Sequence, residues 1–156
     1  MQVPPLRLPP SGKLFVVCGL WLVALGTYFL FLRPAFLPED PRYIGASLEA
    51  IRSAAPGLER WLGHVFNVMG GFMVATGAMT VLVACHSLAR RERGTLLAMS
   101  VAGAASVALM SATNFLLYSD FRWPLLLPAL LWLAGLLCYL RESAVPSAVE
   151  SQTPKT

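Results

Sequence analysis

Charged residues are scarce in this chain, and they are missing altogether from four long apolar stretches. Only 13% of the 156 residues are Asp, Glu, Lys or Arg, against roughly 25% in a typical soluble domain. None of them falls within residues 14–32, 61–84, 95–118 or 123–140. A helix needs about 20 mostly apolar residues to cross roughly 30 Å of hydrocarbon. The sequence therefore predicts an all-α, polytopic membrane protein with four transmembrane helices.

Signatures of known chemistry are also lacking. The chain has no P-loop, no dinucleotide fingerprint and no hydrolase-type order of Ser, His and Asp. Its three cysteines have no CxxC spacing, and its two histidines are 22 residues apart, so neither set has the spacing of a metal motif. The pI of about 9.3 comes from cations scattered among short loops, without the basic stripe of a nucleic-acid-binding surface. We expect no cofactor, no metal site and no nucleic-acid partner, and nothing in the sequence supports an enzyme.

The predicted spans fill most of one domain, residues 1–141, and short connections favour an antiparallel four-helix bundle. The first loop is the longest, and Ser47 is a suitable N-cap for a short amphipathic helix over residues 48–55. We expect this helix to lie on the membrane surface, and the alternative is a lid or docking surface over the bundle. Residues 142–156 are rich in Ser, Pro and Thr and are predicted to form a disordered cytoplasmic tail.

Orientation follows from the positions of the cations, because Lys and Arg are enriched in cytoplasmic loops. With four spans, one side carries seven of them, and the other side carries five. The first set comprises Arg7, Lys13, Arg90, Arg91, Arg93, Arg141 and Lys155, and the second comprises Arg33, Arg42, Arg52, Arg60 and Arg122. Arg outnumbers Lys ten to two, a bias common in GC-rich bacterial genomes. We therefore predict a multi-pass protein of the bacterial inner membrane with both termini in the cytoplasm.

Small residues recur every four positions in two of the predicted spans. The second span has Gly63, Asn67, Gly71 and Ala75, and the third has Ser100, Ala104, Ala108 and Ala112. Small side chains allow transmembrane helices to approach closely. These ladders are predicted to pack helices within the bundle, and the alternative is that one of them faces outward and forms a homo-oligomer.

Polar side chains gather near one end of the second and third spans. His64 and Asn67 begin the second span, and Ser111, Asn114 and Tyr118 end the third. In antiparallel neighbours the two groups would lie at the same depth, and each group shares one helical face. Polar groups within a membrane mark a candidate ligand site. Hydrogen bonds that only fasten two helices would give the same pattern, so both interpretations stay open.

One segment resembles a group of small, functionally uncharacterised four-helix bacterial membrane proteins. The resemblance is carried by Phe36-Leu37-Pro38-Glu39-Asp40, by Tyr43-Ile44-Gly45, by Trp61 and by the run from Val65 to Met73. It covers about the middle third of the chain. It implies a four-helix bundle whose first loop is on the outer side, and it implies no activity.

Three functions are compatible with these features. The first is a non-enzymatic bundle that binds a membrane-protein partner or a lipid. The second is a small-molecule binding or permeation protein that uses the polar cluster of the second and third spans. The weakest is a membrane enzyme or redox protein that acts through His64 or through Cys18, Cys85 and Cys138.

Overall fold

The computed structural model describes residues 8–88 and 90–144, and every regular element within these ranges is helical. The elements in chain order are α1 (Pro10–Phe31), α2 (Asp40–Ile44), α3 (Leu48–Ala54), α4 (Leu58–Val83), the π-helical segment η1 (Ala84–Leu88), α5 (Thr95–Gly103), the π-helical segment η2 (Ala104–Ala108), α6 (Leu109–Leu116) and α7 (Arg122–Ala144). Four stretches are long and apolar enough to cross a membrane: Pro10–Phe31, Leu58–Leu88, Thr95–Leu116 and Arg122–Glu142. The predicted all-α class with four spans is thus confirmed.

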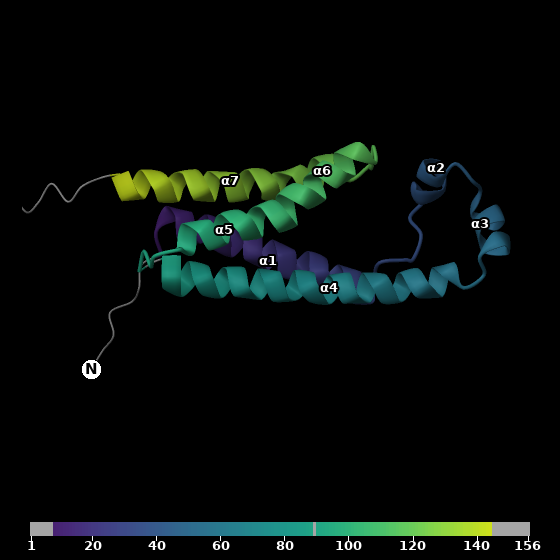
Figure 1. Cartoon of the computed structure of the whole chain (residues 1–156), viewed down its shortest axis with the longest axis horizontal. Coiled ribbons are helices and arrows are strands. Elements are labelled where there is room, and N and C mark those ends of the chain that lie inside the picture. Colours follow the sequence, from purple (N-terminus) through teal and green to yellow (C-terminus); the bar gives the residue numbers. More distant parts are fainter. Residues whose placement is uncertain (1–7, 89, 145–156) are drawn as a thin grey trace, which may run out of the picture.

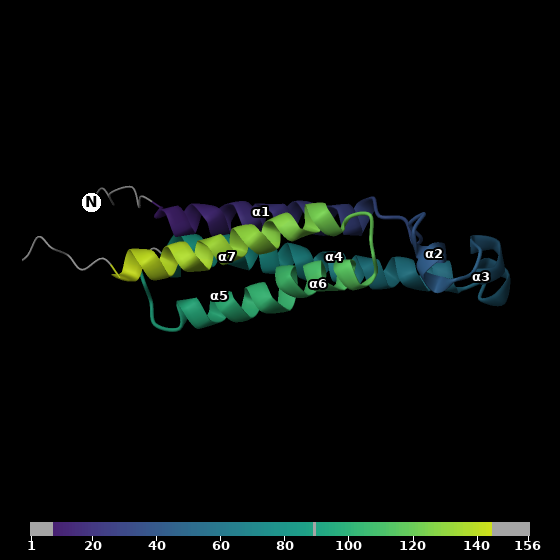
Figure 2. The ribbon, with the colours of Figure 1, turned by 90° about the horizontal axis from the view of Figure 1, so that it is seen from above.

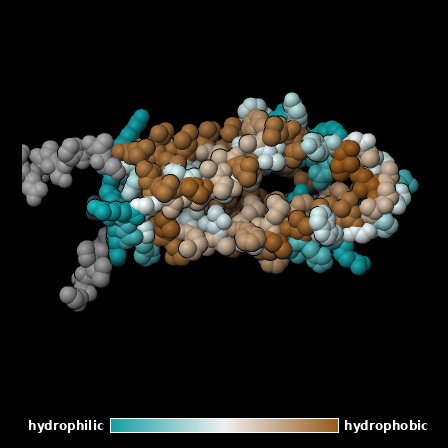
Figure 3. Space-filling view, viewed as in Figure 1, coloured by the Kyte–Doolittle hydropathy of each residue, from teal (hydrophilic) through white to brown (hydrophobic). Residues whose placement is uncertain are grey.

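The middle of the molecule is covered with apolar side chains, while hydrophilic ones gather at both ends (Figure 3). Large hydrophobic side chains that are about half exposed or more lie on all four spans, including Val17, Leu20, Phe72, Met79, Leu97, Val101, Leu130 and Leu133. A soluble protein rarely exposes contiguous apolar surface on this scale. The four helices therefore form an integral membrane protein.

Glycines bring α1 and α4 into backbone contact. A Cβ atom on Gly77 would lie 2.5 Å from the carbonyl oxygen of Gly19, and one on Gly26 would lie 2.7 Å from that of Gly70. The later glycine of α1 therefore faces the earlier glycine of α4, because Gly26 lies opposite Gly70 and Gly19 lies opposite Gly77. The two helices thus run in opposite directions. Within each helix the paired glycines are seven residues apart, so they stay on one face of the helix.

A second face of α1 packs against α7, so α1 contacts both α4 and α7, and α5 and α6 lie on the opposite side of the molecule (Figures 1 and 2). The Phe15 ring meets the Trp132 indole edge to face at 5.3 Å between ring centroids. The buried core consists of Phe15, Cys18, Leu22, Ala84, Leu88, Met99, Val107, Trp132 and Tyr139. None of these residues lies in residues 25–31 of α1 or in residues 58–83. We call the part of the molecule around this core, near the start of α1 and the end of α7, the closed half.

A carboxylate holds the two helix ends of the closed half together. Glu142 on α7 accepts hydrogen bonds from the Ser11 backbone N–H at 3.0 Å and from the Ser11 hydroxyl at 2.7 Å. The Arg91 guanidinium lies 3.8 Å from the same carboxylate and 5.3 Å from the centre of the Tyr139 ring. The first N–H groups of a helix have no partner within the helix. Glu142 thus supplies from α7 an acceptor that the start of α1 needs.

The third span packs against α7 through residues spaced four apart. Its buried positions are Thr95, Met99, Gly103, Val107 and Ser111. A Cβ atom on Gly103 would collide with the Trp132 indole, whose Nε1–H donates to the Met99 carbonyl at 3.0 Å. In a regular α-helix a four-residue series turns steadily around the axis. The wider turn of the π-helical segment η2 counteracts this rotation, so the five positions share one face.

The helices diverge at the other end, which we call the loop half because α2 and α3 lie there (Figure 1). Here α6 packs against α7 and η2 but makes no extensive contact with α4 in the described chain. The surface between the α6 side and the α4 side is hollowed (Figure 3). The α4–η1 stretch has 31 residues, or about 46 Å of helix, so it extends past the end of α1.

The first loop contains the short helix that the sequence predicts. It is present as α3, and the Ser47 hydroxyl accepts a hydrogen bond from the Ala50 N–H at 3.1 Å. The predicted tail begins later than expected, because α7 continues to Ala144 and includes residues 142–144. The rest of that tail lies outside the described residues.

Candidate functional site

The first loop is fastened to the loop between α6 and α7 by Glu39. Its carboxylate accepts one hydrogen bond from the Ser119 hydroxyl at 2.8 Å and one from the Asp120 backbone N–H at 2.7 Å. The neighbouring Arg42 pairs with the Asp120 carboxylate at 3.2 Å. Ser119 is buried, whereas the side chains of the Arg42–Asp120 pair are 65% and 71% exposed. The Glu39 contacts therefore form the protected part of this connection.

The α6–α7 turn presents Tyr118 beside the first loop. Tyr118 has a φ of +51°, a left-handed conformation that is strained for a bulky residue. Phe115 and Trp123 pack edge to face at 5.3 Å across the turn, and the Ser119 N–H donates to the Asn114 carbonyl at 3.0 Å. These contacts fix the conformation of the turn. The Tyr118 side chain itself is 77% exposed.

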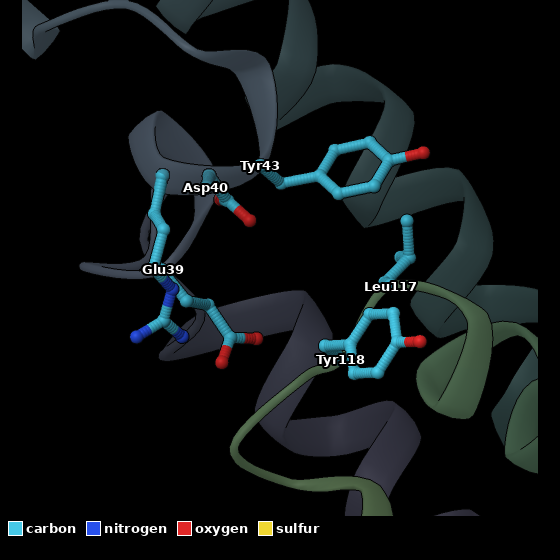
Figure 4. A pocket seen from close by; sticks show the side chains of 6 residues that line it. Glu39, Asp40, Tyr43, Leu117 and Tyr118 are labelled. Carbon is cyan, nitrogen blue, oxygen red and sulfur yellow. The ribbon is translucent and has the colours of Figure 1, made fainter.

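A cavity of about 310 Å³ opens between the two fastened loops. Its lining residues are Glu39, Asp40, Arg42, Tyr43, Leu117 and Tyr118. Figure 4 shows Glu39 and Asp40 on one side of the hollow, with Tyr43, Leu117 and Tyr118 around the rest of it. The lining thus combines carboxylates with two aromatic rings. We call this space the acidic chamber.

A second cavity of about 210 Å³ lies next to the first and is mostly apolar. It is lined by Arg33, Ala35, Phe36, Asp40, Tyr43, Ile44, Leu62 and Phe66. Asp40 and Tyr43 line both cavities, so these two residues form the wall between them. We call this second space the apolar chamber.

Arg33 supplies the cation of the apolar chamber. Its guanidinium carbon lies 3.4 Å from the centre of the Phe66 ring and 5.1 Å from that of Phe29. Burial lowers the pKa of Arg33, while Asp40 and, less strongly, Tyr28 oppose this effect. An arginine stays protonated in proteins at neutral pH. A fixed positive charge therefore stands at the edge of an apolar space.

The predicted polar cluster of the second and third spans is not assembled in the structure. On α4, His64 and Asn67 are exposed, whereas Ser111 on α6 is buried. Asn114 donates to the Met110 carbonyl of its own helix at 2.9 Å. The two groups stay apart because α4 and α6 diverge at this end. Of these five residues, Tyr118 lines the larger cavity together with Leu117 and residues of the first loop.

The predicted packing ladders do not face other helices within the chain. A Cβ atom on Gly63 or Gly71 would have nothing within 4 Å. Ala75, Ala104 and Ala108 are exposed. On α4 a spacing of four residues advances about 40° around the helix at each step, so the ladder leaves the contact face, and Gly70 and Gly77 at seven-residue spacing are the packed glycines of α4. In the third span Ala104 and Ala108 are exposed because each lies one position after a buried residue, Gly103 or Val107. A contact of the exposed ladders with another chain stays a prediction.

The three cysteines lie in different places. The Cys18 thiol is buried and donates to the Pro128 carbonyl at 3.7 Å. Cys138 lies ten residues further along α7, or about 15 Å of helix, and Cys85 is in η1. Across residues 8–88 and 90–144, no group of three or more His, Cys, Asp or Glu side chains is placed to hold a metal ion.

Sequence reasoning missed most of the residues at this site. Glu39, Arg42 and Asp120 interact across 78 to 81 positions of the chain, which no local pattern reveals. One sequence feature pointed to this site: acids and prolines are concentrated in the first loop. A lid or docking surface was one of the two interpretations of that loop. Comparison of the chain with family models, with curated proteins and with solved structures finds no match.

Proposed function

We propose that this protein is a non-enzymatic, multi-pass membrane protein whose loop half binds a lipid of the surrounding bilayer. The four long apolar helices make it an integral membrane protein. The observation that carries the proposal is the unequal packing of its two halves. The closed half has a continuous core, whereas the loop half has two adjoining cavities behind a polar fastening. The larger cavity is lined by Leu117 at the end of α6 and the smaller one by Leu62 and Phe66 of α4, so a lipid in the bilayer would reach them between these two helices.

The proposed arrangement in the membrane places the four spans as an antiparallel bundle. The closed half and both termini face the cytoplasm of a bacterium, as the count of cations favours. The loop half then lies at the outer surface, with α3 at the interface, where its exposed Glu49 and Arg52 meet water. The resemblance to small four-helix bacterial membrane proteins supports the same arrangement.

Native mass spectrometry of the protein in mild detergent tests the lipid proposal. Ala35 lines the apolar chamber, so Ala35→Trp would fill it, while Ala54 is exposed on α3 outside both chambers and Ala54→Trp serves as the control. We expect the natural chain and the control to carry a lipid that Ala35→Trp lacks. Equal lipid retention by all three proteins, or no retained lipid in any of them, would contradict the proposal.

A second candidate is a membrane-protein partner or a second copy of this chain. It is favoured by Gly63 and Gly71, which are open on α4 although small residues in membranes commonly mark helix contacts. Crosslinking in native membranes tests it with Gly71→Leu. We expect this variant to lose a crosslinked species that Phe72→Leu, at the adjacent exposed position, retains. Identical crosslinking by both variants would count against the ladder as an interface.

A further inference from the structure

The charges and ring faces of the two chambers define the head group of the lipid. This step rests on the proposed lipid-binding function and goes beyond it, because it names the chemistry that would be recognised. We propose that the acidic chamber takes a primary ammonium group, that Arg33 takes the adjoining phosphate, and that the apolar chamber takes the start of an acyl chain. The ligand is therefore a phospholipid with an ethanolamine head group.

The acidic chamber has a surplus of negative charge. Glu39 and Asp40 both line it, and Arg42 is the cation of its lining. Arg42 is paired with Asp120, which lies outside the lining. Arg33 is the next cation that interacts with Glu39 and Asp40 through their charges, and it stands at the edge of the apolar chamber. The three carboxylates Glu39, Asp40 and Asp120 thus outnumber the two guanidinium groups of Arg42 and Arg33 by one, and a bound positive charge would offset the difference.

The carboxylates also have acceptor sites to spare. Each oxygen of Glu39 accepts one hydrogen bond, and Asp40 Oδ2 accepts from the Leu37 N–H at 2.7 Å. An ionised carboxylate offers about four lone-pair sites. A primary ammonium group has three N–H donors that need such acceptors. A quaternary ammonium group has none, and the chamber therefore favours ethanolamine over choline.

Two tyrosines provide aromatic faces for the same cation. Tyr43 and Tyr118 are 67% and 77% exposed and lie around one hollow (Figure 4). A cation is attracted to the face of an aromatic ring within about 6 Å of its centre. The strained backbone of Tyr118 keeps its ring at the chamber.

Arg33 lies where the phosphate of such a lipid would be. In the part of the chain that the structure describes, its guanidinium donates one hydrogen bond, to the Pro34 carbonyl at 3.0 Å. A guanidinium has five N–H donors in a fork that suits phosphate oxygens. Asp40 lies between Arg33 and the acidic chamber, since it lines both cavities. Along the site, the carboxylates of the acidic chamber come first, Arg33 comes next and the apolar side chains come last. This order matches the ammonium group, the phosphate and the acyl chain of the lipid.

Lipid titration followed by native mass spectrometry tests this assignment on the full chain in detergent. The probes are phosphatidylethanolamine, phosphatidylcholine and phosphatidylglycerol with the same acyl chains. We expect the ethanolamine lipid to bind at least about fivefold more tightly than the other two. Equal binding of the three lipids, with Ala35→Trp still abolishing it, would overturn the head-group assignment and leave the proposed function intact. Absence of lipid binding in every case would overturn the proposed function itself.

Variants with matched controls sharpen the test. Tyr118→Leu should weaken ethanolamine-lipid binding by about two- to fivefold, the range expected for one exposed cation–aromatic contact. Phe72→Leu, which changes a similarly exposed aromatic ring outside both chambers, should leave it unchanged. Asp40→Asn should reduce the preference for ethanolamine over glycerol head groups, and Glu49→Gln on α3 should not. Equal effects of a variant and its control would contradict the assignment.

A free amine is the other source of the same chemistry. Ethanolamine in solution carries the ammonium group without the phosphate and the acyl chain. Added in a large excess over the lipid, it should fail to displace the phospholipid, because it reaches the acidic chamber alone. Full displacement by ethanolamine, with no need for the apolar chamber, would overturn the assignment of a lipid.

Discussion

Glu142 and Glu39 hold opposite ends of the molecule with nearly the same bonds. Each accepts from one serine hydroxyl and one backbone N–H, and each is accompanied by an arginine. Their surroundings differ. Behind Glu142 lies the aromatic and aliphatic core of the closed half, whereas behind Glu39 lie two cavities. The same kind of polar contact therefore lies next to a packed core at one end of the molecule and next to two open cavities at the other.

The largest effect expected concerns the glycine contacts of α1 and α4. Gly77→Leu would drive a side chain into the backbone of Gly19 and Val23, which cannot move aside as a side chain can. We expect a loss of about 3 kcal/mol or more, at the upper end of overpacking costs. Thermal unfolding in detergent measures it, with Ala78→Leu, at the adjacent exposed position, as the control that leaves the unfolding temperature unchanged. Equal unfolding temperatures for the two variants would mean that α1 and α4 are not in close backbone contact at Gly77.

The next effect concerns the centre of the closed half. Trp132→Phe removes the Nε1–H bond to Met99 and shrinks a side chain that is only 2% exposed. We expect a loss of about 1–3 kcal/mol in stability. Trp123, which is 63% exposed, gives the control Trp123→Phe, measured in the same denaturation experiment. A larger loss for the control would place the stabilising core in the loop half.

The two glutamates can be compared directly. Glu142→Ala leaves the fully buried Ser11 hydroxyl without its acceptor, at a cost of about 1–3 kcal/mol. Glu39→Ala also leaves a buried hydroxyl, that of Ser119, without its acceptor, but the exposed Asp120 N–H can turn to water, so we expect a smaller cost of about 1 kcal/mol. Hydrogen exchange of the Asp120 amide should nevertheless rise in Glu39→Ala and stay unchanged in Glu142→Ala. Equal exchange in both variants would show that Glu39 does not hold the α6–α7 turn.

The smallest effect is expected at the exposed ion pairs. Arg42–Asp120 and Arg52–Glu59 have side chains that are between 46% and 71% exposed. Exposed pairs of this kind contribute little to stability. Glu59→Gln should therefore leave the free energy of unfolding unchanged within the error of most denaturation curves. A loss as large as that of Glu142→Ala would show that the loop half depends on these pairs.

The sequence was sufficient for the class of protein because hydrocarbon imposes a simple demand on length and polarity. Its four apolar stretches correspond to the four spans within a few residues. The helix contacts were harder to predict, since the four-residue ladder of α4 rotates away from α1, and in the third span the buried four-residue series begins at Thr95 and not at Ser100. The pairs Gly19 with Gly26 and Gly70 with Gly77, at seven-residue spacing, were visible in the sequence and would have located the α1–α4 seam.

The candidate site was harder still. Its prediction assumed that the second and third spans are neighbours along their whole length, whereas α6 turns toward α7. Packing of Gly103 against Trp132 and the π-helical turn η2 direct the third span that way. The contacts of Glu39 with Ser119 and Asp120 join two loops whose sequences carry no sign of each other. Only the three-dimensional path of the helices brings them together.

The contacts of α1 with both α4 and α7 have a consequence for the order of assembly. Of the four spans α1 is the first in chain order, yet one of its two partners is α7, which is the fourth. The hairpin of α1 and α4 can form by glycine contact as soon as both are in the bilayer. The aromatic pair of Phe15 and Trp132 must wait until the final helix has left the ribosome. A chain stopped before α7 would therefore lie in the membrane with a paired first hairpin and no core.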